Sequence, residues 1–201
     1  MRRGLLVAML AMALGGPAHA ADLLERGGAT AVVAPVAPLP SWRLVDELRA
    51  GVFAHDPESP EGGSADVNLE ALSRRLPIGT GGGWQQWLAP RLHVGGTINT
   101  AGKTSQAYFG LTWTVDVTRW LFVEASFGGA ANNGYGGLKA FAPPGMSALG
   151  CNFMFRESAS AGLRLDEHWS VMATIEHTSN AGLCNENRGL TNFGGRLGYR
   201  F

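Results

Sequence analysis

The sequence is poor in charged residues, and it has no long apolar run that would cross a membrane as a helix. Only 16% of the 201 residues are charged and the formal net charge is zero, so no basic field points to nucleic acid as a partner. Nowhere does the chain reach the ~18 uninterrupted apolar residues expected of a transmembrane helix. A protein with this composition enters a membrane, if it does so at all, as a β-barrel.

The amino end has the layout of a secretory signal peptide. Two arginines precede an apolar run from Leu5 to Leu14, and Ala18-His19-Ala20 is the small-x-small pattern of a cleavage site. We expect a signal peptide over 1–20, removed after Ala20. Residues 21–42 are rich in Ala, Val and Pro and predict an extended tether, which leaves one domain over 43–201.

Cysteine is also scarce, with only Cys151 and Cys184 in the chain. An exported chain can form a disulfide, and both cysteines fall in loops expected on the same side of the fold. Two inert thiols are the alternative. A metal site is the least favoured reading, because neither cysteine has neighbouring ligands.

From about residue 43 onward, apolar and polar residues alternate with a period of two, which predicts strands with one apolar face. In the clearest example, Phe109 and Leu111 alternate with Tyr108 and Thr112. Eight segments show this pattern: 44–55, 65–71, 91–99, 108–117, 121–127, 152–165, 168–176 and 192–201.

The character of the two faces favours a membrane barrel over a soluble sandwich. One face is apolar throughout, and the other carries the charged residues, as the interior of a small outer-membrane barrel does. The predicted fold is therefore all-β, an eight-stranded antiparallel transmembrane β-barrel without room for a solute channel. We expect a packed ionic interior in which Arg156, Arg164, Arg196 and Arg200 face Glu70, Glu124, Asp116 and Glu176.

The connections alternate in length. Those at 117–119 and 165–168 are short, whereas 56–64, 129–151 and 178–190 are longer. Short turns are periplasmic and long loops face outside in bacterial barrels, so the strand that begins at residue 168 should end at the cell surface. The segment 74–90 departs from this rhythm, because it is long and should lie on the periplasmic side.

The candidate chemistry lies at the outer end of that strand. His177 and Ser179 are two residues apart, so both side chains project from one face with Cα atoms ~7 Å apart. An imidazole at that spacing can act as general base for a serine hydroxyl. Both residues share the parity of Trp169 and Ile175, which places them on the lipid face. A polar pair there is costly and calls for a reason, and a substrate that is itself a membrane lipid would supply one.

The string His177-x-Ser179-Asn180-Ala181-Gly182, followed by Asn187, resembles the outer-membrane lipid A 3-O-deacylases, also called the acyloxyacyl hydrolase-like family. The resemblance implies an eight-stranded barrel whose Ser-His-Glu triad removes an ester-linked acyl chain from lipopolysaccharide, with no metal or organic cofactor. It makes Ser179 the nucleophile and His177 the base. Asn180, Gly182 and Asn187 would lie in the oxyanion-binding region. The terminal Tyr199-Arg200-Phe201 likewise resembles the signal read by the barrel-assembly machinery.

The chain departs from the family at the acid that orients the histidine, because Thr191 occupies that position. A threonine cannot stabilise an imidazolium as a carboxylate does. Glu157 is the first substitute, since counting back through the turn at Asp166 places it beside His177 on the apolar face. Glu157 could instead lie at the headgroup boundary, or point inward beside Arg156 if the register differs. Glu186, in the loop, is a weaker substitute.

Three readings follow. The first is an outer-membrane esterase acting on lipid A among the outer-membrane lipids, with Ser179 and His177 as catalytic residues and Glu157 or Thr191 orienting the ring. The second is a structural or adhesion-type barrel, inactive because the family acid is absent. The third is a soluble periplasmic lipid-binding barrel.

Overall fold

Alternation of side chains along the strands is the feature from which the fold follows. The computed structural model describes residues 44–78, 83–136 and 141–201; the expected signal peptide and tether lie outside these residues. In β4, Tyr108 is 1% exposed and its neighbour Phe109 is 58% exposed, so inward and outward faces alternate as the sequence predicts. The barrel strands are β1 Glu47–His55, β2 Ser64–Arg75, β3 Arg91–Asn99, β4 Gln106–Asp116, β5 Leu121–Asn132, β8 Phe153–Arg164, β9 Trp169–Ser179 and β10 Leu190–Arg200.

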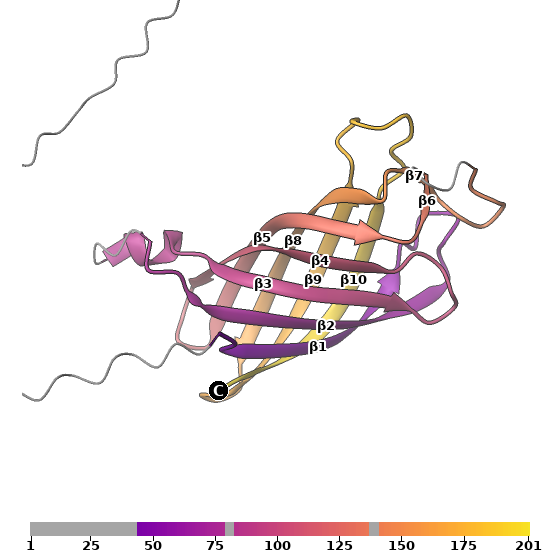
Figure 1. Ribbon diagram of the computed structural model, residues 1–201. Helices are drawn as coiled ribbons and strands as arrows, with labels where there is room; N and C mark the ends of the chain where they lie inside the picture. Colours follow the sequence, from indigo (N-terminus) through magenta and orange to yellow (C-terminus); the bar gives the residue numbers. More distant parts are fainter. Residues whose placement is uncertain (1–43, 79–82, 137–140) are drawn as a thin grey trace, which may run out of the picture. The chain divides into compact units, whose positions relative to one another are not determined.

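These eight strands form one closed antiparallel barrel in the order β1-β2-β3-β4-β5-β8-β9-β10, with β10 pairing back onto β1 (Figure 1). Closure leaves no strand edge with unpaired backbone groups, which is the condition for crossing a bilayer with strands. The predicted fold class is confirmed. No helix of the described residues is long and apolar enough to cross a membrane.

Polar and charged side chains fill the barrel. Arg156 and Glu176 are each 1% exposed and are joined by an ion pair of 2.5 Å. Arg196 reaches Glu176 at 3.4 Å and Glu70 at 3.5 Å. The expected ionic interior is therefore present.

Two of the expected ionic partners differ. Glu124 is paired with Arg49 at 2.7 Å, and Arg200 reaches Glu47 at 3.3 Å at one mouth of the barrel. The barrel brings β1 against β10 on one side and β2 on the other, and it places Arg49 across the lumen from β5. Alternation along a single strand carries no information about such cross-lumen partners.

The two ends of the barrel differ in their connections (Figure 1). Short turns at 117–120 and 165–168 and the 3-10 helix η1 (Gly83–Leu88) lie at one end. The loops 56–63 and 180–189 lie at the other, together with the two short paired strands β6 (Tyr135–Gly136) and β7 (Ala148–Gly150). We call these the turn end and the loop end. The irregular segment before β3 contains η1 and lies at the turn end, as expected from strand order.

Candidate active site

The end of β9 carries His177 and Ser179 on the outer face of the barrel. Thr178 and Glu176 are each 1% exposed and point inward, whereas Ile175 is 42% exposed. His177 and Ser179 are half-buried and share the parity of Ile175. The strand extends through Ser179, so both side chains project from the same, otherwise apolar surface, as the sequence predicts.

A row of polar side chains crosses the outer face at this level. His177 is paired with Glu157 of β8 on one side and with Thr191 of β10 on the other. Directly opposed residues in an antiparallel pair have Cβ atoms about 5 Å apart. The position of Glu157 beside His177, expected by counting through the turn between the two strands, is the observed register.

The histidine ring is held by Thr191. His177 Nδ1 lies 2.8 Å from Thr191 Oγ1, within hydrogen-bonding distance. When Nδ1–H donates to the threonine oxygen, Nε2 carries a free lone pair and can accept a proton. Thr191 therefore holds the ring at Nδ1 without bringing a charge to it.

Gly189 makes room for the ring. A Cβ at this position would lie 3.1 Å from His177 Cε1 and 3.2 Å from the Thr178 carbonyl oxygen, and Gly189 has a φ of 69°. Both the space and the left-handed backbone favour glycine. Because Leu190 pairs with Thr178, Gly189 lies level with Ser179, and the Cε1 side of the imidazole faces that end of β9.

Ser179 is paired with Phe155 of β8, one row beyond His177. No hydrogen bond joins its hydroxyl to the His177 ring within the part of the chain that the structure describes. Catalytic hydrogen bonds of this kind often form only when substrate is bound. The shared face and the spacing of two residues still put base and hydroxyl within reach of one ester group.

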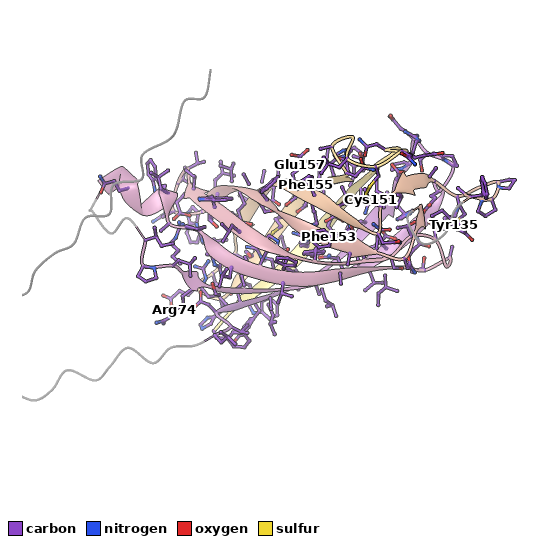
Figure 2. The ribbon with its side chains drawn as sticks, turned by 45° about the horizontal axis from the view of Figure 1, so that its top comes forward. Arg74, Tyr135, Cys151, Phe153, Phe155 and Glu157 are labelled. Atoms are coloured by element: carbon purple, nitrogen blue, oxygen red, sulfur yellow. A yellow bond between two sulfur atoms is a disulfide. The ribbon has the colours of Figure 1, made fainter. Side chains whose placement is uncertain are left out.

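Glu157 is exposed and forms no ion pair among the described residues. Figure 2 shows Glu157 on β8, followed towards the loop end by Phe155 and Phe153 and then by Cys151. Phe155 stacks on Phe127 at a centroid distance of 6.0 Å. The carboxylate therefore lies at the border between a polar row and an aromatic surface.

The loop after Ser179 is tightly bonded around Asn180. Its side chain is 1% exposed and donates from Nδ2 to the carbonyl oxygens of Leu149 at 2.8 Å and Glu186 at 2.5 Å. The Asn180 N–H donates to Asn187 Oδ1 at 2.9 Å, and Gly182 N–H donates to Asn180 Oδ1. The Nδ2 hydrogens of Asn180 are thus used in hydrogen bonds within the loops, and they do not point to a substrate.

Asn187 differs from Asn180 in its exposure. Its Oδ1 is fixed by the Asn180 N–H, and the side chain is otherwise exposed. The Nδ2 group is therefore positioned and accessible. Glu186 is also exposed and contributes its backbone carbonyl to the loop; among the described residues, no hydrogen bond or ion pair joins its side chain to His177.

A disulfide joins Cys151 to Cys184, with Cα atoms 6.0 Å apart. It ties the segment that contains β7 to the loop that follows Ser179. Of the readings left open by the sequence, the bonded one is correct. Among the described residues no group of three or more His, Cys, Asp or Glu side chains is placed to hold a metal ion.

Asp56 is a neighbour of the site that sequence reasoning missed. It follows β1, is 6% exposed, and accepts the Thr191 N–H at its Oδ1 atom at 3.1 Å. Asp56 and Thr191 are 135 positions apart in the chain. Only closure of the barrel between β1 and β10 brings them together, and no local pattern signals it.

The fold and the site together define an outer-membrane β-barrel that carries a histidine-serine pair on its lipid-facing surface. Residues 64–200 match the family described as lipid A 3-O-deacylase (PagL). The chain therefore belongs to the lipid A 3-O-deacylase family, a family of ester hydrolases, and the resemblance noted in the sequence is confirmed.

Three solved structures are similar to this chain, and the first of them supports the fold. The crystal structure of the outer-membrane enzyme PagL is 20% identical, covers 77% of this chain and 99% of its own, and superposes with a TM-score of 0.59. A designed transmembrane β-barrel is 14% identical to this chain, and the match covers 79% of this chain and 96% of the designed one, with a TM-score of 0.49. The Yersinia pestis outer-membrane protein Ail is 11% identical to this chain, and the match covers 78% of this chain and 99% of Ail, with a TM-score of 0.42. No curated protein matches the sequence.

Proposed function

We propose that the protein removes the 3-O-linked acyl chain of lipid A with Ser179 as nucleophile and His177 as general base. One observation carries the mechanism: Thr191 fixes the Nδ1 side of an imidazole that stands on the lipid-facing surface, two residues before a serine. The substrate is a membrane lipid whose ester group lies at the headgroup boundary. A polar site on the outside of the barrel meets such a substrate without the substrate leaving the bilayer.

In the first half of the reaction, Ser179 Oγ attacks the ester carbonyl carbon while His177 Nε2 accepts the hydroxyl proton. The tetrahedral intermediate carries its negative charge on the former carbonyl oxygen. Asn187 Nδ2 donates to that oxygen, because its amide is held by Asn180 and its donor group is accessible. Gly182 and Asn180 act as the framework that fixes Asn187.

The intermediate collapses when the bond from carbon to the sugar oxygen breaks, and His177 returns its proton to that oxygen. A water molecule then attacks the acyl-Ser179 ester with His177 again as base, which releases the fatty acid and restores the serine. Thr191 holds the ring in one tautomer throughout. Glu157, on the opposite flank, has only a weak effect on the imidazolium, because solvent and salt screen its exposed carboxylate.

The site faces the outer leaflet in this proposal. The turn end, with two of its three connections short, is periplasmic and the loop end is at the cell surface, which is the usual arrangement in bacterial barrels. Lipopolysaccharide and the surrounding outer-membrane lipids are the partners, and the barrel-assembly machinery inserts the chain into the membrane.

Mass spectrometry of lipid A tests the proposal in a bacterium that lacks the activity. Expression of the wild-type chain removes one hydroxyacyl mass from lipid A, and Ser179→Ala abolishes the change. Ser126→Ala is the matched control, because that hydroxyl faces Ser158 at 2.6 Å inside the barrel. An unchanged lipid A spectrum from a correctly folded wild-type barrel would favour the inactive structural barrel instead.

A further inference from the structure

The acid that the family places beside the histidine has a substitute elsewhere in the barrel wall. We infer that Asp56 is the positioning residue that supplies the negative charge of the catalytic triad, acting on His177 through Thr191. This inference rests on the proposed function, since it assigns a role within the same site.

A continuous chain of contacts joins Asp56 to the histidine. Asp56 Oδ1 accepts the Thr191 N–H at 3.1 Å, and Thr191 Oγ1 lies 2.8 Å from His177 Nδ1. One threonine therefore touches the carboxylate with its backbone and the imidazole with its side chain. Only Thr191 therefore separates the Asp56 carboxylate from the His177 ring, which becomes positively charged during the reaction.

Asp56 is held firmly in this position. Its own N–H donates to Asn192 Oδ1 at 3.0 Å, so it is bonded to two consecutive residues of β10. Its φ of 34° is in the left-handed region, which aspartate tolerates better than most side chains. The first residue after β1 is thus turned back onto the start of β10 rather than continuing into the loop.

The carboxylate is also short of partners. Asp56 is 6% exposed, its Oδ2 atom is buried without a hydrogen-bond donor, and no ion pair to it occurs among the described residues. The neighbouring His55 is engaged elsewhere, with Asp66 at 2.8 Å and Glu61 at 2.9 Å. A buried carboxylate without a permanent cation is costly, and a transient imidazolium beside Thr191 would offset that cost.

A structural role and an electrostatic role predict different results for Asp56→Asn. Asparagine keeps the Oδ1 acceptor for the Thr191 N–H and keeps the backbone donor, so a purely structural role survives the change. The charge is lost. We expect kcat to fall about tenfold with KM unchanged, because the missing charge acts on the transition state and not on lipid binding.

Thr191→Glu provides the rescue. A glutamate at 191 places a carboxylate directly against His177, so the double variant Asp56→Asn/Thr191→Glu should recover wild-type kcat or exceed it. In the Thr191→Glu background the loss of Asp56 should have little effect, a non-additivity that a stability defect would not produce. Asp116→Asn, which removes a carboxylate paired with Arg164 at the turn end, is the control expected to leave kcat unchanged.

Labelling of Ser179 by a small fluorophosphonate probe separates this inference from the choice of substrate. The rate constant for labelling the folded wild-type barrel should fall about tenfold in Asp56→Asn and return in the double variant. If lipid A is untouched but labelling follows this pattern, the proposed substrate fails and the role of Asp56 holds. Equal labelling of wild type and Asp56→Asn, absence of rescue, or no labelling of wild type would each overturn the role of Asp56.

Discussion

At the scale of single residues, the site combines a fixed imidazole with a neutral orienting group. Thr191 can select the tautomer of His177, which is one of the two tasks of a triad acid. The other task, compensation of the imidazolium charge, needs a carboxylate. Two carboxylates lie near the ring: Glu157, which is exposed, and Asp56, which is buried behind Thr191. A charge on Asp56 is screened less, because its surroundings have the lower dielectric constant.

Thr191→Val tests the orienting bond. Valine has nearly the same shape but no hydroxyl, so His177 loses its partner at Nδ1 and samples the wrong tautomer. We expect kcat for lipid A hydrolysis to fall by about 10- to 100-fold, corresponding to one lost hydrogen bond of about 1–3 kcal/mol. Thr191→Ser, which keeps the hydroxyl, should retain most of the activity; equal loss in both variants would contradict the assignment.

Gly189→Ala tests the space beside the ring. The added methyl group would lie 3.1 Å from His177 Cε1 on a backbone with a φ of 69°, so the ring must shift by a few tenths of an ångström. Gly102→Ala is the matched control, because its φ is 73°, no atom lies within 4 Å of the added Cβ, and it lies between β3 and β4, away from the site. Activity measured on detergent-solubilised barrels should fall at least tenfold more for the first variant. Equal losses would mean that backbone strain, not ring placement, is responsible.

At the scale of secondary-structure elements, β9 decides where the chemistry faces. Parity is local information, so the sequence is sufficient to predict that His177 and Ser179 lie outside and Glu176 inside. The tight turn at Asp166 also fixes the register with β8, which is why the pairing of Glu157 with His177 could be predicted. Glycine and polar residues at the ends of strands predict where the loops lie, but they do not predict the hydrogen bonds within the loops.

The parts of the site that depend on distant segments could not be predicted. Asp56 meets Thr191 only because β1 and β10 close the barrel. The Nδ2 atom of Asn180 reaches the Leu149 carbonyl across two loops, which turns an expected oxyanion donor into a structural residue. Both contacts depend on tertiary geometry, which alternation along one strand does not encode.

Cleavage of the disulfide tests how much the loops support the site. Cys151–Cys184 holds the Leu149 segment against the loop that contains Asn180 and Asn187. The variant Cys151→Ser/Cys184→Ser should lose several-fold in kcat, while the melting temperature of the barrel changes little because the strands are unaffected. Reductant should reproduce the loss in the wild type and add nothing to the variant. An unchanged kcat would show that the loop keeps its shape without the bond.

At the scale of the whole molecule, the protein is polar inside and apolar outside. Ion pairs such as Arg156–Glu176 fill the lumen, and large apolar side chains such as Leu69, which is 63% exposed, cover the wall. Composition and alternation predict this inversion. The choice of partners, such as Arg49 with Glu124, depends on strands that meet only across the lumen.

A buried polar cluster around Glu61 lies at the loop end, and the pH dependence of its stability is testable. Burial raises the pKa of Glu61, but hydrogen bonds from His55, the Ser147 N–H and Thr104 outweigh burial and lower it to about 2. A carboxyl whose folded pKa lies below its ordinary value stabilises the fold above that ordinary value and loses the effect as the pH falls towards 2. The rate of pepsin cleavage of the loops, divided at each pH by the rate for an unfolded peptide substrate, should therefore increase between pH 4.5 and 2.

Glu61→Gln supplies the comparison for this effect. Without the carboxylate, the loops should be cleaved faster even at the upper end of that pH range and should show little further change as the pH falls. Identical pH profiles for the variant and the wild type would show that another group controls the loop end.

Trapping of the acyl-enzyme is the most direct test of the central claim that Ser179 and His177 act on lipid A from the outer face of β9. Wild-type barrels mixed with lipid A, quenched in acid and digested should yield a Ser179 peptide heavier by one hydroxyacyl group, and His177→Ala should yield none. Hydrolysis of lipid A by the wild type with the acyl group on another residue, or undiminished hydrolysis by Ser179→Ala, would contradict it.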